Sequence, residues 1–167
     1  MTRLFLTVAF AAAAMVSSAQ TQYAAKITVN SGNSFVVKQL KIQGDRLYAD
    51  AGQSSTSLSM ISAIEFRFSG ISLNMCASMF EKGDRKSLES LLEQSVGPVA
   101  QYSYLPTNLG EYLMWTLRAR YWNGNEAGFG TTFGQIRQSK ETARAEEASL
   151  YFALLLLDQG KVDNAKT

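Results

Sequence analysis

The segment from Ala145 to Ala165 constrains the fold of this chain more than any other. Its run from Leu150 to Leu157 places apolar residues on nearly every side of a helix, and the turn Asp158-Gln159-Gly160-Lys161 follows. Glycine is common where a helix ends. A helix that is apolar on nearly all sides is normally buried between neighbours. We therefore predict a helical hairpin here, flanked by other helices.

The same glycine turn occurs twice upstream. Glu81-Lys82-Gly83-Asp84 and Trp122-Asn123-Gly124-Asn125 each follow an apolar helical stretch. The three turn glycines lie 41 and 36 residues apart, close to the period of stacked helix pairs. The pattern predicts a stack of antiparallel helix pairs over residues 71–167.

Helical periodicity supports the first pair of helices and the first helix of the second pair. Apolar residues recur every three or four positions, which is the spacing of one helix face. They are Leu73, Cys76, Met79 and Phe80 in a first helix and Leu88, Leu91, Leu92 and Val96 in a second. Gly97-Pro98 then breaks the second helix, and residues 99–108 are expected to form an ordered connector. The next helix, residues 109–122, is the most aromatic, and Thr107 or Asn108 can cap it.

Glycines interrupt the segment that should pair with this aromatic helix, at positions 128, 130 and 134. Each glycine costs about 0.8–1 kcal/mol relative to alanine inside a helix. We therefore predict a late-starting or irregular helix from about Thr131 to Ser139. Alternatively, the glycines let this backbone approach Trp115 and Trp122 closely.

Residues 23–68 show the pattern of short β-strands. Turn signals such as Asn30-Ser31-Gly32-Asn33 and Gly44-Asp45 separate alternating apolar runs, and residues 52–57 form a polar loop. We expect about five strands in a small antiparallel sheet or partly open barrel. A module of this size is small for independent stability, so it should pack on the helices. The predicted fold class is α+β, with a β module over residues 20–70 and a helical domain over residues 71–167.

The N-terminus has the composition of a secretory signal peptide. Arg3 precedes an uncharged run whose most apolar part, Leu4 to Val16, has 13 residues, and Ser17-Ser18-Ala19 supplies small residues for cleavage. A helix needs about 20 residues to span a bilayer. We predict that residues 1–19 are removed after Ala19, and that the mature chain is periplasmic or secreted without membrane insertion. An uncleaved membrane anchor is the alternative.

Charge and cysteine content exclude several classes of interaction. Without residues 1–19 the chain has 15 basic and 14 acidic side chains, so its net charge gives no reason to expect nucleic acid as a partner. Cys76 is the only cysteine, so no disulfide can form within the chain. A lone thiol in an oxidising compartment is expected in the core, and a disulfide between chains is the alternative.

No pattern of catalytic or metal-binding residues is found. The sequence has no histidine, which removes imidazole-based hydrolases and leaves a poor set of zinc ligands. The glycine-rich residues 128–134 lack the spacing and the lysine of a phosphate-binding loop. Glu146 and Glu147 are adjacent on a helix and do not face each other as an acid–base pair. We expect no enzymatic activity, no catalytic residue, no cofactor and no metal.

Three residues of the last helical unit carry a resemblance to a known family. Ala153 is a small residue in a first helix, Gly160 is the turn glycine seven residues later, and Ala165 is a small residue five beyond it. This spacing resembles the tetratricopeptide repeat. The first unit matches more loosely, with Cys76 at the first small position and Gly83 at the turn, and the middle unit matches only at its turn.

The resemblance implies an α-solenoid that binds a protein or peptide along a concave face lined by first helices. Aligned on the turn glycine, Met114, Arg118 and Tyr121 of the middle unit would face that groove, as possible partner-binding residues. Arginine and large aromatic residues are frequent anchors of protein interfaces. For Trp115 and Trp122 of the same helix, a core position is the preferred interpretation.

The β module carries a fainter resemblance. Lys26-Ile27-Thr28-Val29, followed later by a strand ending Ile61-Ser62-Ala63-Ile64-Glu65-Phe66, is similar to SH3-like or Sm-like modules that precede helical repeats in secreted bacterial proteins. This likeness implies a small bent sheet or barrel. It assigns no functional residue.

Together these features predict a non-enzymatic scaffold or assembly factor of the cell envelope. The alternative is a module that binds cell-wall or extracellular glycan through Tyr102, Tyr104 or Trp115, because aromatic rings stack on sugar faces. The chain as given ends at Thr167, early in the second helix of the last pair. We expect the rest of that pair from a longer natural chain or from a partner. The oligomeric state is left open.

Overall fold

The computed structural model describes residues 23–139 and 142–161. The predicted signal peptide, residues 1–19, lies outside the described residues, as does Ala165 of the proposed repeat.

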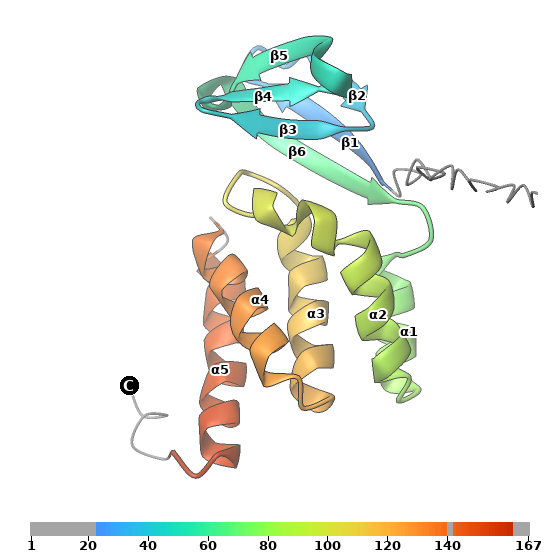
Figure 1. The fold of residues 1–167 in the computed structure, drawn as a ribbon, viewed down its shortest axis with the longest axis vertical. Helices are drawn as coiled ribbons and strands as arrows, with labels where there is room; N and C mark the ends of the chain where they lie inside the picture. Colours follow the sequence, from blue (N-terminus) through green and yellow to red (C-terminus); the bar gives the residue numbers. More distant parts are fainter. Residues whose placement is uncertain (1–22, 140–141, 162–167) are drawn as a thin grey trace, which may run out of the picture.

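Six strands form two antiparallel sheets of three strands each (Figure 1). The strands are β1 (Tyr23–Val29), β2 (Ser34–Val37), β3 (Leu40–Gln43), β4 (Arg46–Ala49), β5 (Ser54–Ser57) and β6 (Ile61–Phe68). The strand orders are β2-β1-β6 and β3-β4-β5. Two 3-10 helices, η1 (Asp50–Gly52) and η2 (Leu58–Met60), flank β5. The α+β class and the antiparallel β module are therefore confirmed.

The sixth strand is the one that the sequence pattern missed. Residues 54–57, inside the expected polar loop, form β5 and pair antiparallel with β4. They read Ser-Ser-Thr-Ser and are exposed or half-buried, so no apolar alternation marks them as a strand. Backbone pairing with β4 therefore makes this segment a strand, although its side chains show no strand pattern.

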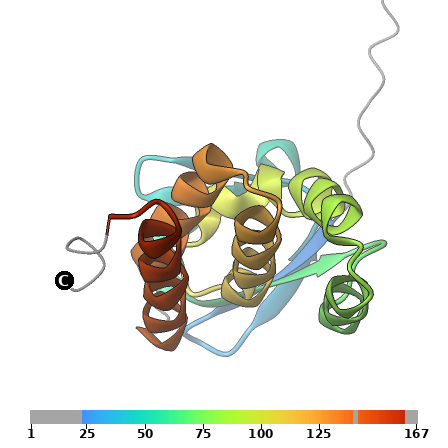
Figure 2. The same ribbon diagram turned by 90° about the horizontal axis from the view of Figure 1, so that it is seen from below.

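The helices follow the β module in the chain and extend away from it (Figure 1). They are α1 (Leu73–Glu81), α2 (Arg85–Ser95), η3 (Gly97–Tyr102), α3 (Leu109–Trp122), α4 (Glu126–Gln138) and α5 (Thr142–Asp158). Figure 2, which looks along the helices, shows α3 between α1 and α5, with α2 and α4 in a second row. The aromatic helix α3 is central, since it packs against each of the other four α-helices.

Each predicted glycine turn ends a helix. Gly83, Gly124 and Gly160 follow α1, α3 and α5, with φ angles of 81°, 70° and 71°. In each turn the glycine N–H donates to the carbonyl three residues back, and the next N–H donates to the carbonyl five residues back. This is the Schellman arrangement, which needs a left-handed residue and therefore favours glycine.

The fourth helix begins earlier than predicted. α4 starts at Glu126 rather than near Thr131. The side chain of Asn125 accepts a hydrogen bond from the N–H of Gly128 at 2.9 Å and so caps the helix. The cap and the contacts of α4 with α3 outweigh the low helix propensity of the three glycines.

One hydrophobic core joins the β module to the helices. Phe66 stacks on Tyr102 with ring centroids 6.3 Å apart, and Phe68 meets Tyr112 edge-on at 5.0 Å. The Tyr102 hydroxyl donates to the carbonyl of Leu40 at 2.8 Å, which ties η3 to the second sheet. The prediction that the β module packs on the helices is confirmed.

The connector before α3 closes the free edge of β6. The N–H of Ile64 donates to the carbonyl of Pro106 at 2.8 Å. The side chain of Asn108 accepts from the N–H of Phe66 at 2.8 Å and donates to its carbonyl at 2.9 Å. Asn108 therefore extends the sheet and does not use its side chain to cap α3, whose first N–H donates to the Thr107 hydroxyl at 3.3 Å. Covering an edge in this way blocks pairing with other strands.

None of the helices within residues 23–139 and 142–161 combines the length and the apolar character that crossing a bilayer requires.

Candidate functional site

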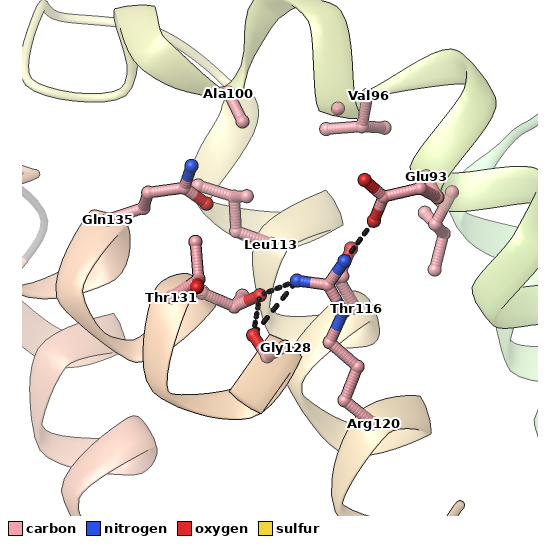
Figure 3. Close-up of a pocket in the computed structure, with 12 residues that line it drawn as sticks. Glu93, Val96, Ala100, Leu113, Thr116, Arg120, Gly128, Thr131 and Gln135 are labelled. Atoms are coloured by element: carbon pink, nitrogen blue, oxygen red, sulfur yellow. Dashed lines mark hydrogen bonds and ion pairs between the residues drawn. The ribbon is translucent and has the colours of Figure 1, made fainter. Parts of the chain in front are cut away.

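A polar cavity of about 210 Å³ lies between α2, η3, α3 and α4 (Figure 3). Arg120 from the last turn of α3 and Glu93 from α2 contribute its charged groups, and Gln135 from α4 faces it from the opposite side. Val96 and Leu113 add apolar walls. Charged, polar and apolar side chains thus meet in one cavity among the helices.

Arg120 is held by groups from two neighbouring helices, although only 9% of the residue is exposed. Its Nη1 donates to the carbonyl of Gly128 at 2.9 Å and to the Thr132 hydroxyl at 2.6 Å, both on α4. Its Nη2 pairs with the carboxylate of Glu93 on α2 (Figure 3). Its Nε lies 3.6 Å from the carboxylate of Glu89, also on α2. A buried guanidinium thus links α2, α3 and α4.

The carboxylate of Glu89 extends this network to the turn after α3. It accepts hydrogen bonds from the side-chain amides of Asn123 and Asn125, each at 2.6 Å. We call Arg120, Glu89, Glu93, Asn123 and Asn125 the Arg120 cluster. The cluster contains one cation and two carboxylates, so it offers no excess positive charge to attract an anion.

Gly128 allows α4 to approach the Arg120 cluster closely. A Cβ atom on Gly128 would lie 2.6 Å from the Asn125 amide nitrogen and 2.9 Å from the Arg120 Nε. By contrast, a Cβ on Gly130 or Gly134 would have no such neighbour within 4 Å. One of the three glycines, Gly128, therefore allows the predicted close approach of the α4 backbone. The neighbours that it approaches are Arg120 and Asn125, and not the tryptophans.

The threonine hydroxyls that line the cavity donate hydrogen bonds within their own helices. The hydroxyls of Thr116, Thr131 and Thr132 each donate to the carbonyl four residues earlier in their own helix, at 2.9, 3.1 and 3.1 Å. The volume suits several water molecules. Over the described part of the chain, no three side chains of the His, Cys, Asp and Glu types gather closely enough to hold a metal ion.

The predicted partner-binding residues do not line an open groove. Met114 is 1% exposed and belongs to the core. Arg118 pairs with Glu147 of α5, and the Tyr121 hydroxyl donates to Asp158 of α5 at 2.7 Å. This is a correction to the predicted site: α5 engages Arg118 and Tyr121, and Met114 is buried, so all three residues are occupied within the chain.

An ion-pair network fixes α5 to α3. Glu147 receives both Arg118 and Arg144, the second at 3.3 Å, and Arg144 also pairs with Glu111 near the start of α3. The carboxylates of Glu111 and Glu147 therefore act in helix packing. Networks of this kind orient helices more than they add stability.

The aromatic residues named for a glycan site differ in exposure. Tyr102 is 6% exposed, so its ring is not available to a sugar. Trp115 is half-buried, with the Phe80 ring 5.6 Å away and the Arg118 guanidinium 4.6 Å above it. Tyr104 is exposed.

The core position predicted for Trp122 is wrong. The residue is 54% exposed, and the guanidinium of Arg85 lies 4.6 Å from the centre of its ring. The cation–π contact holds the ring at the surface, where its position at the end of α3 leaves it uncovered.

Cys76 occupies the core, as predicted. The residue is fully buried in α1, and this burial raises the pKa of its thiol to about 11. We expect the folded chain to resist a thiol reagent such as Ellman's reagent at about pH 8, because the reactive thiolate is scarce and enclosed. One equivalent should react after unfolding in guanidinium chloride. Rapid reaction of the folded chain would contradict this assignment.

The outer face of α5 is the largest departure from the sequence prediction. One side of the helix packs on α3 and α4 through buried Ala148 and half-buried Tyr151 and Leu155. Three leucines on the opposite side are uncovered: Leu150 (68% exposed), Leu154 (45%) and Leu157 (46%). We call these three residues the α5 outer face. Phe152, one turn after Ala148, lies at the rim of the covered side and stacks on Phe133 of α4. The prediction that this helix is buried on nearly all sides is wrong for the described residues.

The fold defines an α+β protein with a small β module and a helical part that share one core. Comparisons with protein families, with curated proteins and with solved structures found no match.

Proposed function

We propose that this chain is a non-enzymatic protein–protein interaction module, a scaffold or assembly factor of the cell envelope, and that it binds its partner through the α5 outer face. The exposure of three leucines on one side of α5 carries the proposal. Isolated apolar residues are common on protein surfaces, but a contiguous group of them usually marks an interaction site.

The proposed surface is held rigidly, which favours binding. Phe152 stacks on Phe133 of α4 with ring centroids 4.7 Å apart, and the Tyr121–Asp158 hydrogen bond holds the far end of α5. Arg118 and Glu147 hold the near end. A surface that is already ordered loses less conformational freedom when a partner binds.

We propose a tetratricopeptide-like stack for the helical part and an SH3-like or Sm-like relationship for the β module. The two rows of helices in Figure 2 and the shared glycine turns support the first. The short 3-10 helix η2 before the last strand of a six-stranded module supports the second. The composition of residues 1–19 supports a location outside the cytoplasm.

Site-specific photo-crosslinking tests this function. A photoreactive phenylalanine analogue replaces Leu154 in the full chain, produced in the source organism and irradiated in intact cells. We expect an adduct with a protein at this position. The matched control carries the analogue at Met75, which is 40% exposed on α1 and should give no adduct. Absence of any protein adduct at Leu154, or equal adducts at both positions, would overturn the proposal.

A further inference from the structure

We propose that the partner on the α5 outer face is the same face of a second copy of this chain, with the two α5 helices antiparallel. This inference rests on the proposed function, because it names the partner of the same surface.

The exposed leucines of α5 occupy positions equivalent to those at which α3 contacts its neighbours. Aligned on the turn glycines 36 residues apart, Leu150, Leu154 and Leu157 correspond to Met114, Arg118 and Tyr121 of α3. Of these three residues of α3, Met114 lies in the core, and Arg118 and Tyr121 contact α5. The same positions, one unit later, have no covering helix within residues 23–139 and 142–161.

The leucines form a stripe that is complementary to itself. Their spacings of four and three residues place Leu150, Leu154 and Leu157 along one line of the helix surface. In an antiparallel pair, Leu150 of one copy lies opposite Leu157 of the other, and Leu154 lies near the twofold axis. Such an isologous contact closes on itself as a dimer, because each copy contributes the same face.

Charges at the two ends of α5 select the antiparallel orientation. Glu146 is exposed one turn before Leu150, and Lys161 is exposed just after the helix ends. An antiparallel pair brings Glu146 of each copy near Lys161 of the other, twice per dimer. A parallel pair would bring like charges together. Antiparallel helix dipoles favour the same orientation.

Charges elsewhere on the helix do not oppose this pairing. Arg144 and Glu147 are paired with α3 on the covered side. The rim residue Phe152 is already fixed by its stacking on Phe133. The dimer therefore needs no rearrangement of α5.

Sedimentation velocity of residues 20–167 tests the inference over about 1–300 µM. We expect a reversible monomer–dimer equilibrium. Leu154→Glu should raise the dissociation constant at least about tenfold, because it places a charge in the apolar seam. The matched control Met75→Glu, on an exposed apolar position of α1, should leave the constant unchanged. Circular dichroism melting should show that both variants are folded.

Charge exchange tests the orientation. Glu146→Lys and Lys161→Glu should each weaken the dimer about threefold or more, and the double variant should recover the original affinity. A monomeric wild type at every concentration, a dimer indifferent to Leu154→Glu, or a double variant no better than the single ones would overturn the inference. A photo-crosslinked adduct with a mass other than twice that of the chain would overturn it while leaving the proposed function intact.

Discussion

Replacing Arg120 by alanine should lower the free energy of unfolding by about 3 kcal/mol, which corresponds to about 10 °C in melting temperature for a chain of this size. The guanidinium is almost fully buried and donates to the Gly128 carbonyl and the Thr132 hydroxyl. It also neutralises Glu89, whose side chain is 18% exposed. Removing the guanidinium leaves the Glu89 carboxylate without its cation, and the loss of one partner from a buried ion pair costs more than the pair itself contributes.

Urea unfolding followed by circular dichroism measures the Arg120→Ala effect. The matched control is Arg137→Ala on the exposed side of α4, which should change the unfolding free energy by less than about 0.5 kcal/mol. Arg120→Lys should recover part of the loss, because lysine keeps the charge but cannot reach α2 and α4 with a planar fork. Equal stability of the Arg120→Ala and Arg137→Ala variants would show that the cluster does not hold the helices together.

Gly128→Ala should destabilise the chain by about 2 kcal/mol, although alanine is the better helix former by about 1 kcal/mol. The added methyl would lie 2.6 Å from the Asn125 amide nitrogen and 2.9 Å from the Arg120 Nε. Both side chains would have to move. Asn125 would then lose its capping hydrogen bond to the Gly128 N–H, and Arg120 its position between the helices.

Gly130→Ala is the internal control for this prediction. It lies in the same helix with open space around its Cβ position, so it should stabilise the chain by up to about 1 kcal/mol. The two alanine variants should therefore differ by about 2–3 kcal/mol in urea unfolding. Stabilisation by both substitutions would mean that α4 does not approach the Arg120 cluster as closely as described.

Much of the backbone could be predicted from local patterns. The turn glycines Gly83, Gly124 and Gly160 end helices as expected, because positive φ is a property of one residue and its immediate neighbours. The start of α4 was misplaced because a glycine lowers helix propensity wherever it stands. Gly128 is needed partly because Arg120 of α3 approaches it closely. The residues of α4 by themselves do not reveal this contact.

The candidate site was predicted less well than the backbone. The alignment on turn glycines predicts a binding site on α3. There, Met114 is buried in the core, and Arg118 and Tyr121 already contact α5. The equivalent exposed leucines of α5 were expected in the core. Sequence patterns do not identify Arg120 as a site residue. Its only sequence signal is that a charged residue stands within an aromatic helix.

The sequence by itself determined the change from strands to helices near residue 70, the helix stops and the buried thiol, since these depend on periodicity and on single residues. Only the tertiary structure decided that a serine-rich segment becomes β5, that Asn108 extends β6, and that one face of α5 is covered while the other is open. The physical reason is that backbone conformation is set largely by neighbours in the chain, whereas burial of a helix face depends on which distant segment packs against it.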